Sequence, residues 1–236
     1  MLMTKRSTHG MSIVELMIGI TIGLFILAGA TLVVTGQLSE GRRLLTDTQI
    51  QQDLRAASDI IARDVRRAGY TGKAADNVWP TAVADGLVNP YAGMTPEGAA
   101  GTAAGDGVTS SLEYSISDAT NSDDENNVLN TYELSGFRYN PADKTIEILL
   151  GNKNWQALTD PNTVLITKFK IIISSQYLDV PCALTCPVGV AGCPIQLNMR
   201  SVNFEIVGQS ANDPTMQRSL NTTVRLRNDL VREKKC

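Results

Sequence analysis

The residue types that could do chemistry stand close together near the start of the chain, where Gly10 and Met11 precede Glu15. Glu15 opens an apolar run, because no formally charged residue occurs between Leu16 and Leu38. A carboxylate within a membrane-spanning helix costs roughly 2.5–3.5 kcal/mol at mid-membrane and less near an end, so it is rarely left unpaired. Cleavage after Gly10 would give Met11 an α-amine with a pKa of about 7.7–8. That cation would lie four residues from Glu15, or beside the Glu15 of a neighbouring copy.

This segment resembles the processing and assembly segment of type IV prepilins. A short leader contains Lys5 and Arg6, Gly10 follows, and residues 11–18 read MSIVELMI. The resemblance implies that a prepilin peptidase cuts after Gly10 and methylates the new amine of Met11. It also implies that Glu15 guides docking of the subunit into a filament. The family more often has phenylalanine at the first mature position, and Met11 is a permitted departure.

The uncharged run from Leu16 to Leu38 has 23 residues, enough to cross a bilayer as a helix. No small-residue cleavage site follows the run, so we expect it to remain in the mature protein. Lys5 and Arg6 favour a cytoplasmic N-terminus. The resemblance implies an inner-membrane protein of a Gram-negative bacterium, with its head in the periplasm until it enters a surface pilus. The expected divisions are a leader at 1–10, a membrane or filament-core half-helix at 11–38, an amphipathic half-helix at 39–69 and a head at 70–236.

Composition argues against several functional classes. Without Lys5 and Arg6 the chain has 19 basic and 24 acidic residues, a net charge of −5, and no basic cluster typical of a nucleic-acid surface. The one histidine, His9, lies in the leader, so the mature chain has no Ser-His-Asp or Cys-His pair. Paired acids such as Glu113 and Glu133 could do acid–base chemistry, although nothing distinguishes them from ordinary strand acids. We therefore expect a structural protein without catalytic residues, cofactor or metal.

The stem is expected to be helical from about Ser12 to Ala68, since the first proline is Pro80. Its second half has an apolar stripe at helical spacing and charges on the other faces, which predicts packing of one face on the head. Gly69 follows the last turn as a left-handed cap. The stripe comprises Leu54, Ala57, Ile61, Val65 and Ala68.

Gly19 and Gly23 form a small-xxx-small pair within the apolar run. Small residues let membrane helices approach closely, so this pair is a candidate helix-packing site. Two other interpretations stay open, because glycine is common in membrane helices and can also loosen a helix during assembly.

Strand-like patterns begin after a long, loop-rich connection at 72–111. Asn140-Pro141-Ala142-Asp143 is a turn signal between two of the strands and predicts a hairpin. Successive strands with short turns predict an antiparallel sheet covered by the stem, an α+β fold of the type IV pilin-like kind. The expected strands are Leu112–Ile116, Val128–Leu134, Gly136–Tyr139, Thr145–Leu149, Thr163–Ile173, Val202–Val207 and Leu220–Arg227.

Four cysteines remain, and in an exported chain an even number predicts disulfides, here with three possible connectivities. They are Cys182, Cys186, Cys193 and Cys236. A zinc site with four cysteine ligands is the alternative, but the spacing lacks the two paired knuckles of a zinc ribbon.

The acidic run at 121–127 could bind calcium, although it lacks the pattern of an EF-hand loop and is more typical of a solvated loop. We expect the side chains of Trp79 and Trp155 to serve as packing anchors, either in the core or in a loop.

The head resembles PilW-type minor pilins through three segments. These are the tyrosine strand at 131–134, the Trp-containing turn at 155–158 and the C-terminal strand at 222–228 that ends in Arg-Asn. The resemblance implies a subunit that primes pilus assembly near the tip, with the prepilin peptidase, other minor pilins, the major pilin and an inner-membrane assembly platform as partners. The alternatives are a J-type minor pseudopilin of a type II secretion system and a signal-anchored periplasmic binding domain.

Overall fold

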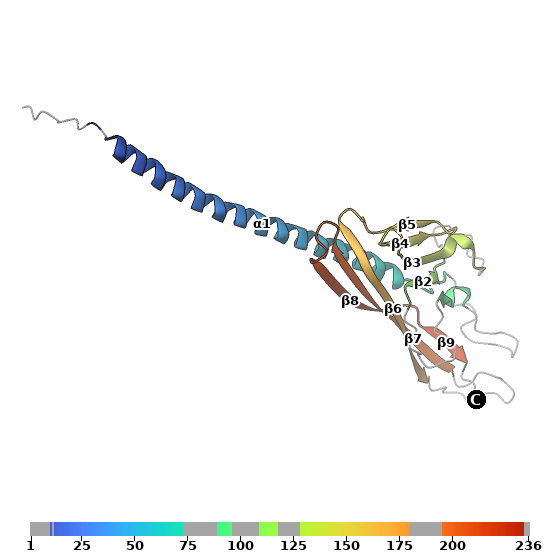
Figure 1. Ribbon diagram of the computed structural model, residues 1–236. Helices are drawn as coiled ribbons and strands as arrows, with labels where there is room; N and C mark the ends of the chain where they lie inside the picture. The colour runs from blue at the N-terminus through green and yellow to red at the C-terminus, as the bar shows by residue number, and fades with distance from the viewer. Residues whose placement is uncertain are drawn as a thin grey trace, which may run out of the picture. The chain divides into compact units, whose positions relative to one another are not determined.

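The computed structural model describes residues 10, 12–72, 89–95, 109–117, 128–179 and 195–233. It divides into two compact units, residues 1–48 and residues 49–236. The helix α1 (Ile13–Val65) contributes to both units (Figure 1).

The first unit consists of the N-terminal part of α1. The helix begins after Ser12, whose carbonyl oxygen accepts a hydrogen bond from the backbone N–H of Leu16 over 3.1 Å. The most apolar stretch of α1 has a mean hydropathy of 2.4, and the helix is long and apolar enough to cross a membrane. This agrees with the membrane span expected from the sequence.

In the second unit, α1 ends three residues before the expected terminus at Ala68. The chain leaves the helix in a tighter turn, in which the N–H of Arg67 bonds the carbonyl of Asp64 over 3.0 Å and the N–H of Ala68 bonds that of Val65 over 3.1 Å. Gly69 then adopts a φ of +76°, as expected for a left-handed cap. Its N–H donates to the carbonyl of Ser115, so the turn is fixed by a strand of the head.

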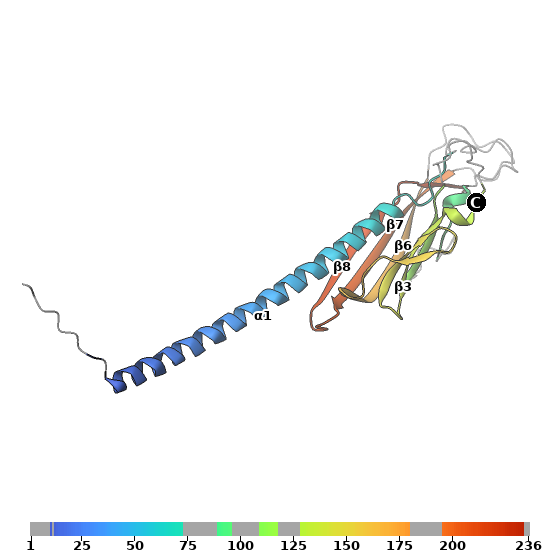
Figure 2. The same ribbon diagram turned by 90° about the horizontal axis from the view of Figure 1, so that it is seen from above.

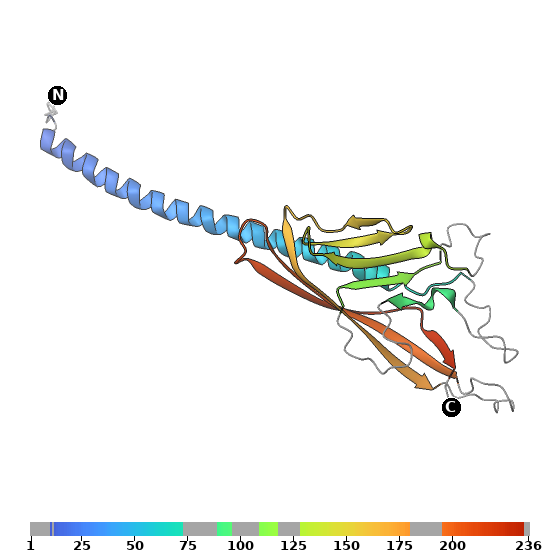
Figure 3. The same cartoon turned by 45° about the vertical axis from the view of Figure 1, so that its right-hand side comes forward.

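The head contains two antiparallel sheets, where the sequence predicted one. The five-stranded sheet has the order β1-β2-β3-β4-β5, and the other has the order β6-β7-β8, with β9 also paired to β7 (Figure 3). Two short 3₁₀ helices, η1 (Pro90–Ala92) and η2 (Thr131–Glu133), accompany the first sheet. The strands are β1 (Met94–Thr95), β2 (Ser111–Ser115), β3 (Leu134–Asn140), β4 (Thr145–Leu150), β5 (Trp155–Ala157), β6 (Val164–Asp179), β7 (Ile195–Ser210), β8 (Gln217–Arg225) and β9 (Leu230–Glu233).

The hairpin predicted at residues 140–143 is confirmed between β3 and β4. The side-chain Oδ1 of Asn140 accepts the backbone N–H of Ala142 over 3.0 Å, the local bond that makes asparagine favourable at a turn. Lys144 completes the turn with a φ of 53°. The register of the hairpin then places Phe137 opposite Ile148.

One edge strand joins the two sheets. The backbone N–H of Ile166 in β6 donates to the carbonyl of Lys144 over 2.8 Å, and the hydroxyl of Tyr139 donates to the carbonyl of Ile166 over 3.1 Å. Further along β6, Ile171 and Thr109 form an isolated antiparallel bridge. The sheets therefore share one hydrophobic core rather than forming separate domains.

The apolar stripe predicted on the helix is confirmed, since all five of its residues are buried. Around this stripe, α1 bonds to both sheets: Asp64 accepts the hydroxyl of Tyr114 in β2, and the hydroxyls of Ser58 and Thr222 in β8 lie 3.0 Å apart. Figure 2 shows β8 running beside this part of the helix. Helix and sheets bury their apolar faces against each other, which confirms the α+β pilin-like arrangement.

One predicted strand is wrong. Residues 131–133 of the expected strand Val128–Leu134 form η2, and β3 begins only at Leu134. The carboxylate of Glu133 accounts for the difference, because its Oε2 accepts the backbone N–H of Asn130 over 2.7 Å and closes a local turn. Strands β6 and β7 extend beyond the predicted limits at Ile173 and Val207, whereas β8 ends at Arg225 rather than Arg227.

Candidate functional site

The candidate processing segment lies at the start of α1. Gly10 and Ser12 are exposed and not helical, Ile13 begins the helix, and Glu15 lies in its first turn. The first turn of a helix has unpaired N–H groups and a partial positive charge, so it is a favourable place for a carboxylate. Met11 lies outside the described residues. The structure thus places Glu15 in the first turn of the helix, five residues after an exposed glycine.

Between Leu16 and Leu38, the surface of the helix is apolar on every side. Phe25, Ile26 and Leu32 are 81%, 68% and 75% exposed, and the most apolar stretch of the helix has no buried residue. A helix that is apolar all round needs an apolar environment, either lipid or the helices of other subunits.

The hydroxyl groups on this surface are bonded within the helix itself. Thr21 Oγ1 donates to the carbonyl of Ile18 over 2.9 Å, Thr31 Oγ1 to that of Leu27 over 2.6 Å, and Thr35 Oγ1 to that of Thr31 over 2.9 Å. Unpaired polar groups are costly in hydrocarbon, whereas these side chains carry their own partners. Between Leu16 and Leu38 the helix therefore presents few polar groups that need water.

The proposed packing residues Gly19 and Gly23 lie on this helix, and a Cβ placed on either would meet no described atom within 4 Å. The space beside both residues is open, which is the condition for close approach of a neighbouring helix. Their role in packing stays a prediction.

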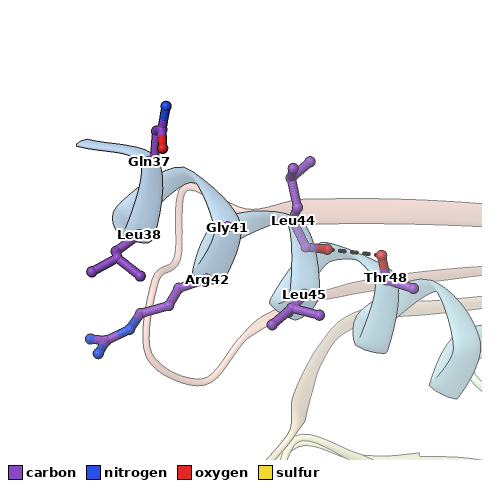
Figure 4. Close-up of a pocket in the computed structure, with 7 residues that line it drawn as sticks. All are labelled: Gln37, Leu38, Gly41, Arg42, Leu44, Leu45 and Thr48. Carbon is purple, nitrogen blue, oxygen red and sulfur yellow. Dashed lines mark hydrogen bonds between the residues drawn. The ribbon is translucent and has the colours of Figure 1, made fainter. Parts of the chain in front are cut away.

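A shallow hollow lies further along the first unit, with a volume of about 500 Å³. Leu38, Arg42 and Leu45 extend to one side of α1 around it, and Thr48 Oγ1 donates to the carbonyl of Leu44 over 2.8 Å (Figure 4). The remaining lining residues are Gln37, Gly41, Leu44 and Thr48. Sequence reasoning did not single out this surface, although the exposed leucines that follow the uncharged run could have indicated it.

The two acids considered for acid–base chemistry lie in different settings. Glu133 is buried, and its Oε1 accepts the hydroxyl of Tyr91 over 3.1 Å while its Oε2 accepts the N–H of Asn130. Glu113 is exposed on β2. These bonds give Glu133 a structural role, fixing η1 and η2 to each other.

Trp155 lies at the start of β5 and is half buried, as expected for an anchor. The guanidinium of Arg138 lies 4.3 Å from the centre of its ring, and Arg138 Nε also donates to Glu147 Oε2 over 2.6 Å. Burial alone would raise the pKa of Glu147, but hydrogen bonds from Asn140 and Arg138 outweigh it and hold that pKa below its ordinary value. This arginine, which sequence reasoning missed, links the middle strands of the first sheet.

Several predicted features lie outside the described residues: His9, Trp79, the acidic run at 121–127 and all four cysteines. The disulfide candidates and the calcium question stay predictions for that reason. Among the residues that the structure does describe, no group of three or more His, Cys, Asp or Glu side chains could hold a metal ion.

Comparison with known proteins gives one match. The family PpdB, prepilin peptidase-dependent protein B, matches residues 43–226, more than three quarters of the chain. No curated protein and no solved structure matches. The matched region covers the second half of α1 and nearly all the described strands, and it begins after the processing segment. The helix, the two sheets and this match agree, and the chain belongs to the PpdB family of prepilin peptidase-dependent proteins.

Proposed function

We propose that this protein is a minor pilin of the PilW type, which takes part in priming the assembly of a type IV pilus. Membership of a prepilin peptidase-dependent family carries the proposal. It is supported by the position of Gly10 just before a long, exposed, apolar helix with Glu15 in its first turn. These are the features that a cleaved and assembled subunit requires.

In this proposal the prepilin peptidase cuts between Gly10 and Met11 and methylates the amine of Met11. The new amine is a cation at neutral pH, and the carboxylate of Glu15 is its counter-ion in a neighbouring subunit. In a medium of low dielectric constant an unpaired charge is costly and a pair is strongly attractive. The pair therefore favours the axial register in which amine and carboxylate meet.

The apolar surface of the first unit serves both stages of assembly. It is stable in the inner membrane before assembly, and in the filament the helices of other subunits replace the lipid. Gly19 and Gly23 would let those helices approach closely. The head stays in the periplasm until the subunit enters the pilus, where other minor pilins, the major pilin and the inner-membrane platform are its partners. The role is structural, without catalysis, cofactor or direct nucleic-acid binding.

The first experiment is mass spectrometry of the native protein and its N-terminal peptide, from the membrane fraction and from sheared surface filaments. We expect a chain that begins at methylated Met11 in both fractions. A matched pair of variants sharpens the result: Gly10→Val should retain the leader, whereas Gly36→Ala, at a glycine far from the cut, should be processed normally.

Two other outcomes of this experiment would each indicate a different functional class. A processed chain that is absent from sheared filaments but co-purifies with a secretion apparatus would indicate a minor pseudopilin of type II secretion. An intact leader in every fraction would contradict the proposal and leave a signal-anchored periplasmic domain.

A further inference from the structure

The shallow hollow on the first unit contains one charged side chain, that of Arg42. Leu38 precedes Arg42 by four residues and Leu45 follows it by three, so the two leucines flank the arginine on one side of α1 (Figure 4). These leucines are 60% and 73% exposed. Gly41 keeps the floor of the hollow open, because a Cβ at this position would meet no described atom within 4 Å. The hollow therefore combines a cation with an apolar rim.

The counter-ion of Arg42 must come from outside its own helix. In the part of the chain that the structure describes, the exposed guanidinium of Arg42 forms no hydrogen bond or ion pair. Helical side chains reach one another at spacings of three or four residues, and no acid occurs at these spacings from Arg42. Arg43 differs, because Glu40 lies three residues before it and Asp47 four residues after it. Of these two adjacent arginines, only Arg42 is open to an external anion without a competing acid.

The length of the helix places Arg42 at the level of lipid headgroups when the uncharged run crosses a bilayer. The run from Leu16 to Leu38 has 23 residues, which give about 34 Å of helix against a hydrocarbon core about 30 Å thick. Arg42 lies four residues beyond Leu38, about 6 Å further along the helix. The headgroups add roughly 5–8 Å on each side of the core, because the whole bilayer is about 40–45 Å thick. The anions available at this level are lipid phosphates.

An anionic phospholipid fits both the charge and the apolar rim of the hollow. The guanidinium of Arg42 has the planar donor geometry that matches phosphate oxygens, while the acyl chains can continue past Leu38 into the hydrocarbon. The flanking leucines exclude water from the ion pair and so strengthen it. A zwitterionic lipid fits less well, because its own cation competes with the arginine for the phosphate. The volume of about 500 Å³ falls within the range of small-molecule sites, roughly 300–1,000 Å³.

We propose that, in the membrane, the hollow around Arg42 binds one anionic phospholipid, with its phosphate on the guanidinium of Arg42 and its acyl chains against Leu38. Lipid phosphates surround the helix at this level, whereas a neighbouring copy would first have to be recruited. The inference rests on the membrane-spanning part of the proposed function. It depends neither on cleavage after Gly10 nor on docking through Glu15, and it applies equally to a subunit of a pilus or of a pseudopilus.

The test uses the full chain in nanodiscs that contain equal amounts of phosphatidylglycerol and phosphatidylcholine. Native mass spectrometry after release from the nanodisc identifies the lipid that stays with the protein. We expect retained phosphatidylglycerol to exceed phosphatidylcholine about tenfold, and Arg42→Gln to remove this preference. Arg43→Gln removes the same charge one residue outside the hollow and should keep the preference. Equal losses in the two variants would overturn the proposal, because they would indicate a general attraction of positive charge to the membrane.

A second pair of variants separates the shape of the hollow from its charge. Gly41→Leu fills the floor of the hollow and keeps Arg42, so it should lower the retention of phosphatidylglycerol several-fold. Gly36→Leu, at a glycine of the same helix that does not line the hollow, should leave retention unchanged. Both variants replace an exposed glycine by a better helix former, so the helix should persist in each. Unchanged retention in Gly41→Leu would overturn the proposed site.

Other occupants of the hollow would give different results. A chain that is dimeric in nanodiscs and becomes monomeric in Glu40→Gln would assign Arg42 to the carboxylate of a second copy. Displacement of the lipid by excess glycerol 3-phosphate, which carries a phosphate without acyl chains, would assign the hollow to a soluble phosphate. Either result would overturn the proposal. Failure of the chain to enter nanodiscs would also contradict the membrane span of the proposed function, whereas entry without a lipid preference would contradict this inference alone.

Discussion

The hydroxyl of Tyr114 in β2 donates a hydrogen bond to Oδ2 of Asp64, in the last turn of α1, over 2.5 Å. The tyrosine is 1% exposed, so this bond ties the helix to the five-stranded sheet inside the core. Asp64 also forms an ion pair with Arg67, three residues further along. One carboxylate therefore connects the end of the helix to both the sheet and the turn that follows it.

Tyr114 should make the stability of the protein fall at high pH. Burial first, and then the charge and hydrogen bond of Asp64, raise the pKa of Tyr114 well above its ordinary value of about 10. Above pH 10 the unfolded chain ionises at this residue while the folded chain keeps its proton, so the free energy of unfolding falls as pH rises toward the folded pKa. Denaturant unfolding between pH 8 and pH 11 measures this. Tyr114→Phe should be less stable at pH 8 by about 1 kcal/mol and should show a shallower decline above pH 10.

The control for this prediction is Tyr132→Phe, which alters an exposed tyrosine and leaves Tyr114 in place. Its stability should decline with pH as steeply as that of the unaltered protein. If Tyr114→Phe keeps the full slope above pH 10, the raised pKa is not coupled to folding.

The hydroxyls of Ser58 and Thr222 should contribute to the attachment of α1 to β8. They lie 3.0 Å apart, and Ser58 is buried. Removing one hydroxyl leaves the other without this bond, so Ser58→Ala and Thr222→Val should each cost about 1 kcal/mol of unfolding free energy. The double variant should cost less than the sum, with a coupling of about 0.5–1 kcal/mol by urea unfolding. Ser219→Ala, at an exposed serine of β8, should have little effect, and additive costs for the pair would contradict the inferred bond.

Gly208 should be required for close packing of helix on sheet. A Cβ at this position in β7 would lie 2.6 Å from Cγ2 of Val164 and 3.1 Å from Cδ2 of Leu54. Gly208→Ala should therefore destabilise the head by about 1–3 kcal/mol through overpacking. Val164→Ala should recover part of this loss when combined with it, because it removes the nearest methyl group. Unfolding midpoints of the two single variants and the double variant measure the recovery, and strict additivity would argue against a steric cause.

The sequence predicted features that arise from local periodicity. The stripe from Leu54 to Ala68 is visible because helical spacing repeats over several turns, and all five of its residues are buried as expected. The hairpin at 140–143 was predictable because Asn140 supplies its own turn-forming bond. The start of the candidate site was equally local, since Gly10 and Glu15 are close in sequence.

Long-range arrangement was less predictable. Alternation along β6 is interrupted by a register shift between Ile166 and Lys168, and its last residues are partly polar and exposed, so the end of the strand was not predictable. The division into two sheets depends on how β6 meets the β3–β4 hairpin, which it does through the hydrogen bond from Ile166 to Lys144. Amino-acid composition does not specify this long-range contact. The prediction of a strand at Val128–Leu134 was wrong because the carboxylate of Glu133 accepts a hydrogen bond within its own turn. The strand propensities of the individual residues do not indicate this local bond.

Glu15 should be needed for incorporation but not for processing. In the proposed function the peptidase acts at Gly10–Met11, whereas the carboxylate of Glu15 acts only when a subunit meets the amine of a neighbour. Loss of a charge-assisted bond costs about 1.5–3 kcal/mol, so Glu15→Ala should lower the ratio of sheared-filament to membrane-bound protein by about tenfold or more. Glu15→Gln should behave in the same way, because it keeps the shape and removes the charge. Glu40→Ala, at an exposed acid of the same helix, should incorporate normally. The ratio is measured by immunoblot, with N-terminal mass spectrometry to show that each variant is cleaved. Normal incorporation of cleaved Glu15→Ala would remove the docking role while leaving the processing site intact.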